Sequence, residues 1–230
     1  MNHSTDLTNP FRKETDVTAS ISHGTPIVFV IDDDVSVRES LELLLGCEGW
    51  QTETFATAQE FLIRPRPDVP SCLVLDVSLP DFNGLDLQKR IAFERTDMPI
   101  MFITGQGDVA TSVQAMKAGA VEFLTKPFEH DVLLEAIRES LDLSRVALAR
   151  EMEMHTLRKR YASLTRRERQ VLALVVSGLL NKQVAGELGI SEITVKAHRR
   201  QVMQKMQAQS FAHLVKIATR LGPHRALNSP

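Results

Sequence analysis

The sequence is poor in cysteine, in aromatic residues and in long apolar runs. Its 230 residues include two cysteines, one tryptophan and one tyrosine, and no apolar run approaches 18 residues. A transmembrane helix needs about 20 apolar residues, so we expect no membrane span. Residues 1–24 are polar without the apolar core of a secretory signal, which predicts a flexible tail on a cytoplasmic chain. Cys47 and Cys72 are then expected to be reduced, mostly buried thiols rather than a disulfide or a metal site.

Glycine and proline are absent from Asp131 through Tyr161. Apolar residues recur there at spacings of three, four or seven, namely Leu134, Ile137, Leu141, Leu148 and Met152. This is the period of an amphipathic helix, so the stretch is predicted to be one long helix. Ser144 and His155 interrupt the heptad pattern, which favours a single helix that packs in some states over a persistent coiled coil.

The two parts of the chain differ in charge. Residues 1–150 contain 13 Lys and Arg against 24 Asp and Glu, whereas residues 151–230 contain 14 against 5, so the formal charges are −11 and +9. With 230 residues, 43% of them hydrophobic, the chain is long enough for two buried cores. We therefore expect an acidic domain with a cation-dependent site and a basic domain that binds a polyanion.

Polar residues follow four apolar runs in the acidic part. The runs are Val28–Ile31, Cys72–Leu75, Ile100–Ile103 and Val121–Thr125, and the residues that end or follow them are Asp32-Asp33-Asp34, Asp76, Thr104 and Lys126-Pro127. The carboxyl ends of parallel strands lie on one edge of a sheet, in the crevice where such sheets bind ligands. The sequence thus predicts an α/β fold in which these side chains form one site.

Charge indicates the chemistry of that site. At an effective dielectric constant near 20, two carboxylates about 4 Å apart repel by about 4 kcal/mol, and a divalent cation between Asp32, Asp33 and Asp76 relieves the repulsion. Oxygen ligands with open water positions suit Mg²⁺. Asp76 can then attack a phosphoryl group while the metal, Lys126 and Thr104 neutralise its equatorial oxygens. The expected product is an acyl phosphate.

This constellation resembles the receiver domain of two-component response regulators over residues 25–143. The resemblance implies a flavodoxin-like, doubly wound parallel sheet of five strands and a cis Lys126-Pro127 bond. The site residues that it implies are Asp76 as the phosphorylated residue; Asp32, Asp33, Asp76 and the backbone carbonyl of Ser78 as ligands of Mg²⁺ or Mn²⁺; and Thr104, Phe123 and Lys126 as switch and phosphate-binding residues. Asp34 is instead expected to cap the next helix, and Asp81 to lie in a turn.

Helix signals are dense after residue 163. The first predicted helix is capped by Thr165, with Glu168 in a capping box, and ends at Gly178. The second, Lys182–Leu188, is capped by Asn181, and the third is capped by Ser191 and runs to Met206. The fourth is Phe211–Leu221. Two consecutive helices joined by a turn with Gly189 indicate a helix-turn-helix within an all-α domain.

The segments Gly178–Lys182 and Ile190–His198 resemble the LuxR-type output domain. A receiver followed by this domain is typical of NarL/FixJ response regulators, and the Gly107-Asp108-Val109 loop with the long linker resembles the FixJ branch. The expected domains are therefore a tail over 1–24, the receiver over 25–143, a helical linker over 144–163, the helix-turn-helix domain over 164–224 and a tail over 225–230.

Helical geometry separates two faces of the predicted recognition helix. Val195, Val202 and Met206 fall on the core stripe, and the opposite face holds Ile193, Lys196, Ala197, Arg200 and Gln204. By resemblance, Lys196, Ala197 and Arg200 occupy base-reading positions. Arg199, Lys182 and Lys205 are expected to reach phosphates.

The preferred reading is a DNA-binding transcription regulator that a sensor histidine kinase phosphorylates on Asp76, not an enzyme. Double-stranded DNA, RNA polymerase and a second phosphorylated copy are the other expected partners. Two alternatives stay open. In the first, Asp32-Asp33-Asp34-Val35-Ser36 is the nucleophile motif of a haloacid-dehalogenase-type phosphatase, with Asp32 as the nucleophile. In the second, the chain is an adaptor whose receiver responds to protein contacts without phosphorylation.

Overall fold

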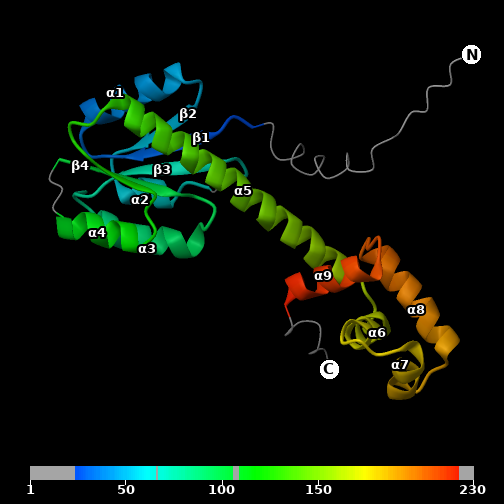
Figure 1. Ribbon diagram of the computed structural model, residues 1–230. Coiled ribbons are helices and arrows are strands. Elements are labelled where there is room, and N and C mark those ends of the chain that lie inside the picture. The colour runs from blue at the N-terminus through cyan, green and yellow to red at the C-terminus, as the bar shows by residue number, and fades with distance from the viewer. Residues whose placement is uncertain (1–23, 66, 106–108, 223–230) are drawn as a thin grey trace, which may run out of the picture. The chain divides into compact units, whose positions relative to one another are not determined.

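The structure, a computed structural model, describes residues 24–65, 67–105 and 109–222 (Figure 1). The chain forms two compact units, residues 1–149 and residues 150–230, which we call the receiver unit and the output unit. The expected tails lie outside the described residues except for Gly24, and so do Gly107 and Asp108 of the FixJ-like loop. Among the described helices, none is long and apolar enough to cross a membrane.

The receiver unit is built on one parallel sheet. Its strands are β1 (Ile27–Ile31), β2 (Gln51–Phe55), β3 (Ser71–Asp76), β4 (Ile100–Thr104) and β5 (Glu122–Thr125). The spatial order is β2-β1-β3-β4-β5 and every pairing is parallel. The order reverses direction between β1 and β3, so the crevice of a doubly wound sheet lies beyond the ends of these two strands. The predicted fold class is confirmed.

Helices cover both faces of this sheet (Figure 1). They are α1 (Val35–Cys47), α2 (Ala58–Leu62), α3 (Gly84–Glu94), α4 (Val109–Lys117) and the first part of α5 (His130–Ala162). Alternate residues of β1 face opposite sides, as the two-residue period of a strand requires. Phe29 packs in a core cluster with residues of α2, α3 and α4, and Val28 packs in a second cluster with residues of α1 and α5.

The long helix α5 runs without a break for 33 residues, as predicted. Ser144 does not interrupt it. The residue is buried, and its Oγ accepts a hydrogen bond from the backbone N–H of Ser71 at 3.0 Å, at the start of β3. His155 is exposed. The two compact units divide between Ala149 and Arg150, inside the segment that we assigned to the linker.

The output unit consists of the end of α5 and four shorter helices within the described residues. These are α6 (Arg166–Val176), α7 (Asn181–Leu188), α8 (Glu192–Lys205) and α9 (Phe211–Leu221). Val195, Val202 and Met206, the predicted core stripe, are at most 1% exposed. Val202 and Met206 pack in a cluster with Leu157 of α5, so the end of the long helix belongs to the core of this unit.

Helix capping in the output unit agrees with the sequence except at α7. The Thr165–Glu168 capping box is present, and Ser191 accepts a hydrogen bond from the backbone N–H of Thr194. The prediction that Asn181 caps α7 is wrong. Asn181 is the first helical residue and Leu180 is the cap, because the Gln183 side chain folds back and accepts the Leu180 N–H at 2.8 Å.

Candidate functional site

The structure brings together Asp32, Asp76, Thr104 and Lys126 at the carboxyl edge of the sheet. Asp76 and Thr104 are the last residues of β3 and β4, whereas Asp32 and Lys126 directly follow β1 and β5. The side chains of Asp32, Asp76 and Thr104 are buried, with exposed fractions of 0%, 6% and 1%. The backbone N–H of Lys126 donates to the Thr104 carbonyl at 2.7 Å, and the Lys126-Pro127 bond is cis, as expected.

Lys126 is the cation of this site. Its Nζ lies 2.7 Å from Asp32 Oδ2 and 3.7 Å from Asp76 Oδ1. The shorter contact is a charge-assisted hydrogen bond, whereas the longer one is an ion pair beyond hydrogen-bond range. The lysine therefore lies between two buried carboxylates and binds one of them directly.

Asp76 retains an unused acceptor. Its Oδ2 accepts the backbone N–H of Ser78 at 3.2 Å, but its buried Oδ1 has no hydrogen-bond partner. Burial raises the pKa of Asp76, and neighbouring Asp32 raises it further, although the Lys126 ammonium opposes both effects. A buried carboxylate oxygen without a donor is unfavourable unless a ligand completes it. This oxygen is therefore a candidate ligand of a cation or nucleophile toward a phosphoryl group.

The carboxylates fit a divalent cation, but they are not arranged as a finished site. Asp33 is exposed, and within the described residues no three His, Cys, Asp or Glu side chains stand ready to hold a metal ion. Asp32 and Asp76 could supply oxygen ligands, and the single charge of Lys126 offsets their negative charge only in part. Oxygen ligands with room for waters are the donor set that Mg²⁺ prefers. The backbone carbonyl of Ser78 was also predicted to bind the metal ion. In the structure, the backbone N–H of Ser78 donates a hydrogen bond to Asp76.

Two further packing contacts lie near the ends of the strands that carry the candidate site residues. Phe123 of β5 is half-buried and packs on Phe102 with ring centroids 6.1 Å apart. Gly84 begins α3 beneath the end of β3, where an added Cβ would lie 2.8 Å from the backbone oxygen of Asp76. Only glycine permits this approach of helix to strand.

Sequence reasoning missed Arg38 and part of the role of Asp81. Arg38 of α1 donates to the backbone carbonyls of Asp32 and Asp33 at 2.6 and 3.0 Å, and so holds the acidic loop. The Asp81 carboxylate accepts the backbone N–H groups of Ala58 and Gln59 at the start of α2. No local pattern signals such contacts, because the partners lie on other elements. Asp34 caps α1, as predicted.

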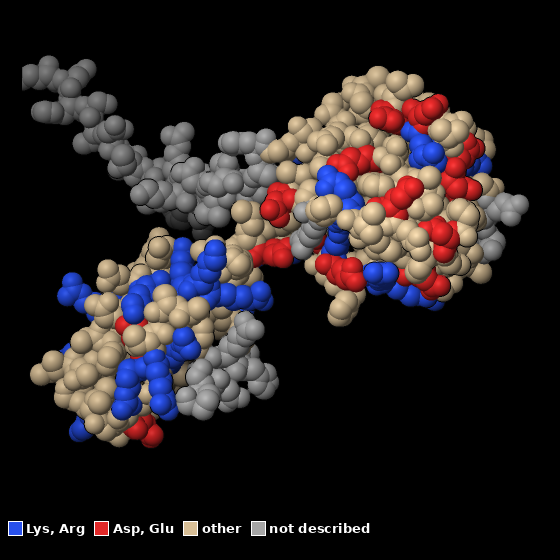
Figure 2. Space-filling model, turned by 180° about the vertical axis from the view of Figure 1, so that it is seen from behind, with Lys and Arg blue, Asp and Glu red and all other residues tan. Residues whose placement is uncertain are grey.

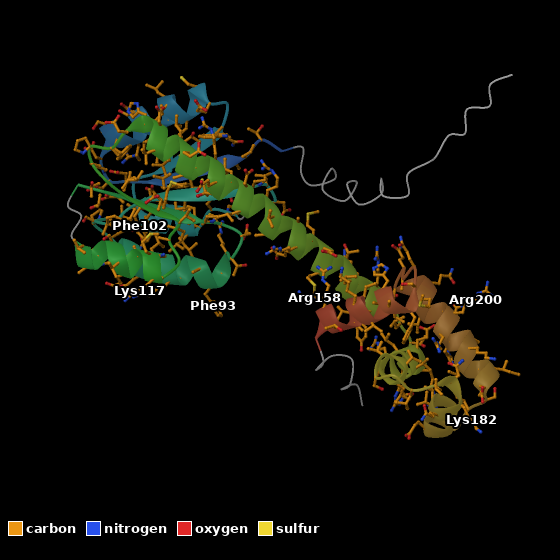
Figure 3. All side chains as sticks on the ribbon, in the orientation of Figure 1. Phe93, Phe102, Lys117, Arg158, Lys182 and Arg200 are labelled. Carbon is orange, nitrogen blue, oxygen red and sulfur yellow. The ribbon has the colours of Figure 1, made fainter. Side chains whose placement is uncertain are left out.

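The second candidate surface is the outer face of α8. Lys196, Ala197 and Arg200 are exposed on it, and Figure 3 shows Arg200 projecting from α8 and Lys182 lying on α7. Figure 2 shows that basic side chains dominate the visible face of the output unit, whereas both signs are interspersed on the receiver unit. A helix with an open basic face suits the major groove of DNA.

Arg199 and Lys205, in contrast, make contacts with other side chains of the output unit. Arg199 donates to Asn181 Oδ1 at 2.6 Å and its guanidinium lies 5.3 Å from the centre of the Phe211 ring, so it joins α7, α8 and α9. Lys205 Nζ lies 2.7 Å from an oxygen of Glu168, which is 4% exposed. The phosphate contacts of these two residues stay a prediction, and in the structure both side chains already make contacts within the output unit.

Comparison with known proteins covers both units. A family model described as "Response regulator receiver domain" matches residues 28–138. A second, described as "Bacterial regulatory proteins, luxR family", matches residues 162–218.

The chain is also similar to known proteins along most of its length. The chain is 46% identical to Nodulation protein W of Bradyrhizobium diazoefficiens over 85% of this chain and 86% of that protein. It is 42% identical to the transcriptional regulatory protein FixJ of the same organism, over 85% and 95% of the two chains. The low-resolution structure of the response regulator StyR matches with a TM-score of 0.76 and 47% identity, over 86% of this chain and all of that one. The chain therefore belongs to the response regulators that join a receiver domain to a LuxR-type helix-turn-helix domain.

Proposed function

We propose that phosphorylation of Asp76 by a sensor histidine kinase controls DNA binding and transcription by this chain. The observation that carries the proposal is the state of Asp76. It is buried at the centre of the carboxyl edge, one of its oxygens has no hydrogen-bond donor, and an ammonium lies 3.7 Å away. A nucleophile with a free oxygen beside a positive charge suits attack on a phosphoryl group.

Asp32, Asp33 and Asp76, with the Ser78 carbonyl, would hold Mg²⁺ or Mn²⁺, and the metal would neutralise charge on the transferred phosphoryl group. Lys126 starts on Asp32, within 2.7 Å, and would shift to pair with the new phosphate oxygens. Thr104, at the end of β4, would donate its hydroxyl to the same phosphate. Asp76 gains the phosphoryl group and the kinase histidine is the leaving group.

Phe123 connects this site to the surface of the receiver unit. Its ring is half-buried beside Phe102, so a shift of Thr104 toward the phosphate would open space for it. We infer that this repacking promotes formation of a homodimer and frees the output unit to act with RNA polymerase in the cytoplasm. Nodulation protein W and FixJ are, by their names, a nodulation protein and a transcriptional regulatory protein, and the second name supports regulation of genes by this chain.

The exposure and the internal contacts of each basic residue suggest which part of the DNA it would contact. Lys196, Ala197 and Arg200 lie on the open face of α8 and would read bases, whereas the exposed Lys182 of α7 would contact phosphate. Arg199 and Lys205 would hold the helices in place for that reading, because both are engaged within the unit.

The phosphatase alternative is disfavoured by the contacts of Asp32. Its Oδ1 accepts the backbone N–H of Asp34 at 3.0 Å and its Oδ2 accepts from Lys126 at 2.7 Å. Both oxygens of that carboxylate are therefore occupied, whereas Asp76 has a free one. The adaptor alternative gives no reason for an unpaired buried carboxylate oxygen beside a lysine.

One experiment separates the three readings. The full chain is incubated with Mg²⁺ and acetyl phosphate, its intact mass is measured, and DNA binding is followed in parallel. We expect one added phosphoryl group and tighter DNA binding, both lost in Asp76→Asn and both kept in Asp81→Asn, which changes a carboxylate that caps α2. Full labelling of Asp76→Asn would favour Asp32 as the nucleophile, and unlabelled wild type with unchanged DNA binding would favour the adaptor.

A further inference from the structure

An apolar side chain lies on the DNA-facing surface of α8. Ile193 is 80% exposed, although isoleucine is among the residues most often found buried in proteins. It is the second residue of α8, after the Ser191 cap. Its exposure is not required by folding, because the core stripe of the same helix, which includes Val195 and Val202, is already buried.

Ile193 lies on the axis of the proposed reading face. At about 100° per residue, Ile193, Ala197, Arg200 and Gln204 fall within about 60° of one another around the helix. All four are exposed. Ile193 and Ala197 are one turn apart, about 6 Å along the axis, so they form a short apolar stretch at the N-terminal end of a basic face.

The N-terminal end of a recognition helix is the part that contacts base edges in the major groove. Most base edges there offer hydrogen-bond donors or acceptors, which an isoleucine cannot use. The C5-methyl group of thymine is the apolar group on this surface. We propose that Ile193 is a specificity-determining residue that packs against a thymine methyl, at a base pair distinct from the one that faces Ala197. This inference rests on the proposed DNA-binding function and adds a base preference to it.

The test removes single methyl groups from the DNA. A duplex is first selected from a random-sequence library with the full-length wild-type chain, treated with acetyl phosphate and Mg²⁺. Each thymine of that duplex is then replaced in turn by uracil, which differs only by the lost methyl group. Burial of one such group corresponds to about fourfold in affinity, so we expect wild type to lose about fourfold at the thymine that Ile193 contacts.

Protein variants identify the residue that reads each methyl group. In Ile193→Ala, replacement of one thymine by uracil should no longer lower the affinity, whereas any other thymine whose replacement weakens wild type should still do so. Ile193→Val, which keeps branched methyl groups, should retain the loss. The matched control is Leu180→Ala, because Leu180 is also an exposed apolar side chain, at 71%, and lies outside the recognition helix. This control should keep every thymine dependence of wild type.

Three results would overturn the inference. One is an unchanged pattern of uracil sensitivity in Ile193→Ala, and another is a wild-type chain that binds the selected duplex but tolerates uracil everywhere. Both leave the proposed DNA-binding function standing. The third, failure of wild type to enrich any sequence, removes the proposed function itself, so the two failures are distinguishable. Thermal melting of each variant verifies that the exposed substitution leaves the fold intact.

Discussion

The two units place their important charges in opposite environments. In the receiver unit, Asp32 and Asp76 are buried, and Asp76 Oδ1 has no hydrogen-bond donor. In the output unit, the buried carboxylate of Glu168 accepts from Lys205 with both oxygens and from the Thr165 N–H, whereas Lys196 and Arg200 are exposed. Under the proposed function, the first unit uses a buried charge that is incompletely paired, and the second unit uses surface charge.

The difference has a physical reason. A buried charge that lacks a partner destabilises the fold, so it marks a place where a ligand completes the structure. A buried charge with all its partners stabilises the fold and has little left to offer a ligand. The polyanion that suits the output unit is too large to be enclosed, so its contacts must be on an open face. Substitutions at Glu168 and at Asp76 should therefore affect different properties.

The largest effect is expected from breaking the buried pair of the output unit. Lys205→Ala should destabilise this unit by about 1.5–3 kcal/mol, because it leaves Glu168 buried without its cation. Hydrogen exchange of the α6 and α8 amides in the full chain measures the loss. Lys159→Ala, which removes an exposed lysine from α5, is the matched control and should change exchange little. Unchanged protection in Lys205→Ala would show that the pair contributes no stability.

The same pair sets the response to acid. Burial alone would raise the pKa of Glu168, but hydrogen bonds from Lys205 and from the Thr165 backbone outweigh it, so the pKa lies below the ordinary value of 4.5. A depressed pKa in the folded state stabilises above that value and stops doing so as pH falls. The stabilisation that Glu168 gives wild type should thus be fully present above pH 4.5 and be lost as pH falls below it, so the stability deficit of Lys205→Ala should shrink in acid. A difference that grows in acid would contradict this sign.

In the receiver unit, the sharpest structural test is at Gly84. A Cβ there would lie 2.8 Å from the Asp76 backbone oxygen and 3.1 Å from Val77 Cα, neither of which can rotate away. Gly84→Ala should cost roughly 1–3 kcal/mol and slow phosphorylation of Asp76. Gly46→Ala is the matched control, because nothing lies within 4 Å of an added Cβ at Gly46, in the last turn of α1. It should not destabilise the unit and should stabilise it by less than about 1 kcal/mol, because Gly46 lies near the end of the helix. Urea unfolding followed by the fluorescence of Trp50 measures both changes.

Much of the receiver site could be predicted because buried central strands leave a plain signal. β1, β3 and β4 each contain a continuous apolar run, and their last or following residues are the candidate site residues. β2, in contrast, reads Gln51-Thr52-Glu53-Thr54-Phe55 and is largely half-exposed at the edge of the sheet. Its pattern is too polar to separate from a loop, so the sequence predicted five strands but located four.

The output unit shows where residue type is not enough. Asn181 is a good helix cap by type, yet Gln183 supplies the capping contact and leaves Asn181 for Arg199. Lys196 and Lys205 look alike in the sequence of one basic helix, but Lys205 reaches Glu168 of another helix. Which cation is free depends on packing between elements, and no local spacing encodes it.

A substitution on the exposed face of α8 should leave the stability of the output unit unchanged and alter its preference for DNA sequence. Arg200→Ala should lose roughly tenfold in affinity for a selected duplex and much less for a scrambled one, because a base contact is removed. Titration of both duplexes with the full chain measures the ratio, and thermal melting should show no loss. Equal weakening on both duplexes would make Arg200 a phosphate contact and change the orientation assigned to α8.

The smallest effect, and the one that separates phosphate contact from base reading, is expected at Lys182. Binding that neutralises phosphates weakens with salt by a slope near −0.9 in log–log form for each phosphate. Lys182→Ala should therefore weaken selected and scrambled duplexes alike and flatten the slope by about one unit. Lys89→Ala is the charge-matched control, since it removes one lysine from an exposed pair with Asp86 in the receiver unit, and it should leave the slope unchanged. If both variants flatten the slope equally, net charge rather than a defined contact of α7 governs binding. A change confined to Lys182→Ala would instead place the N-terminal end of α7 against the DNA backbone, beside the groove that α8 reads.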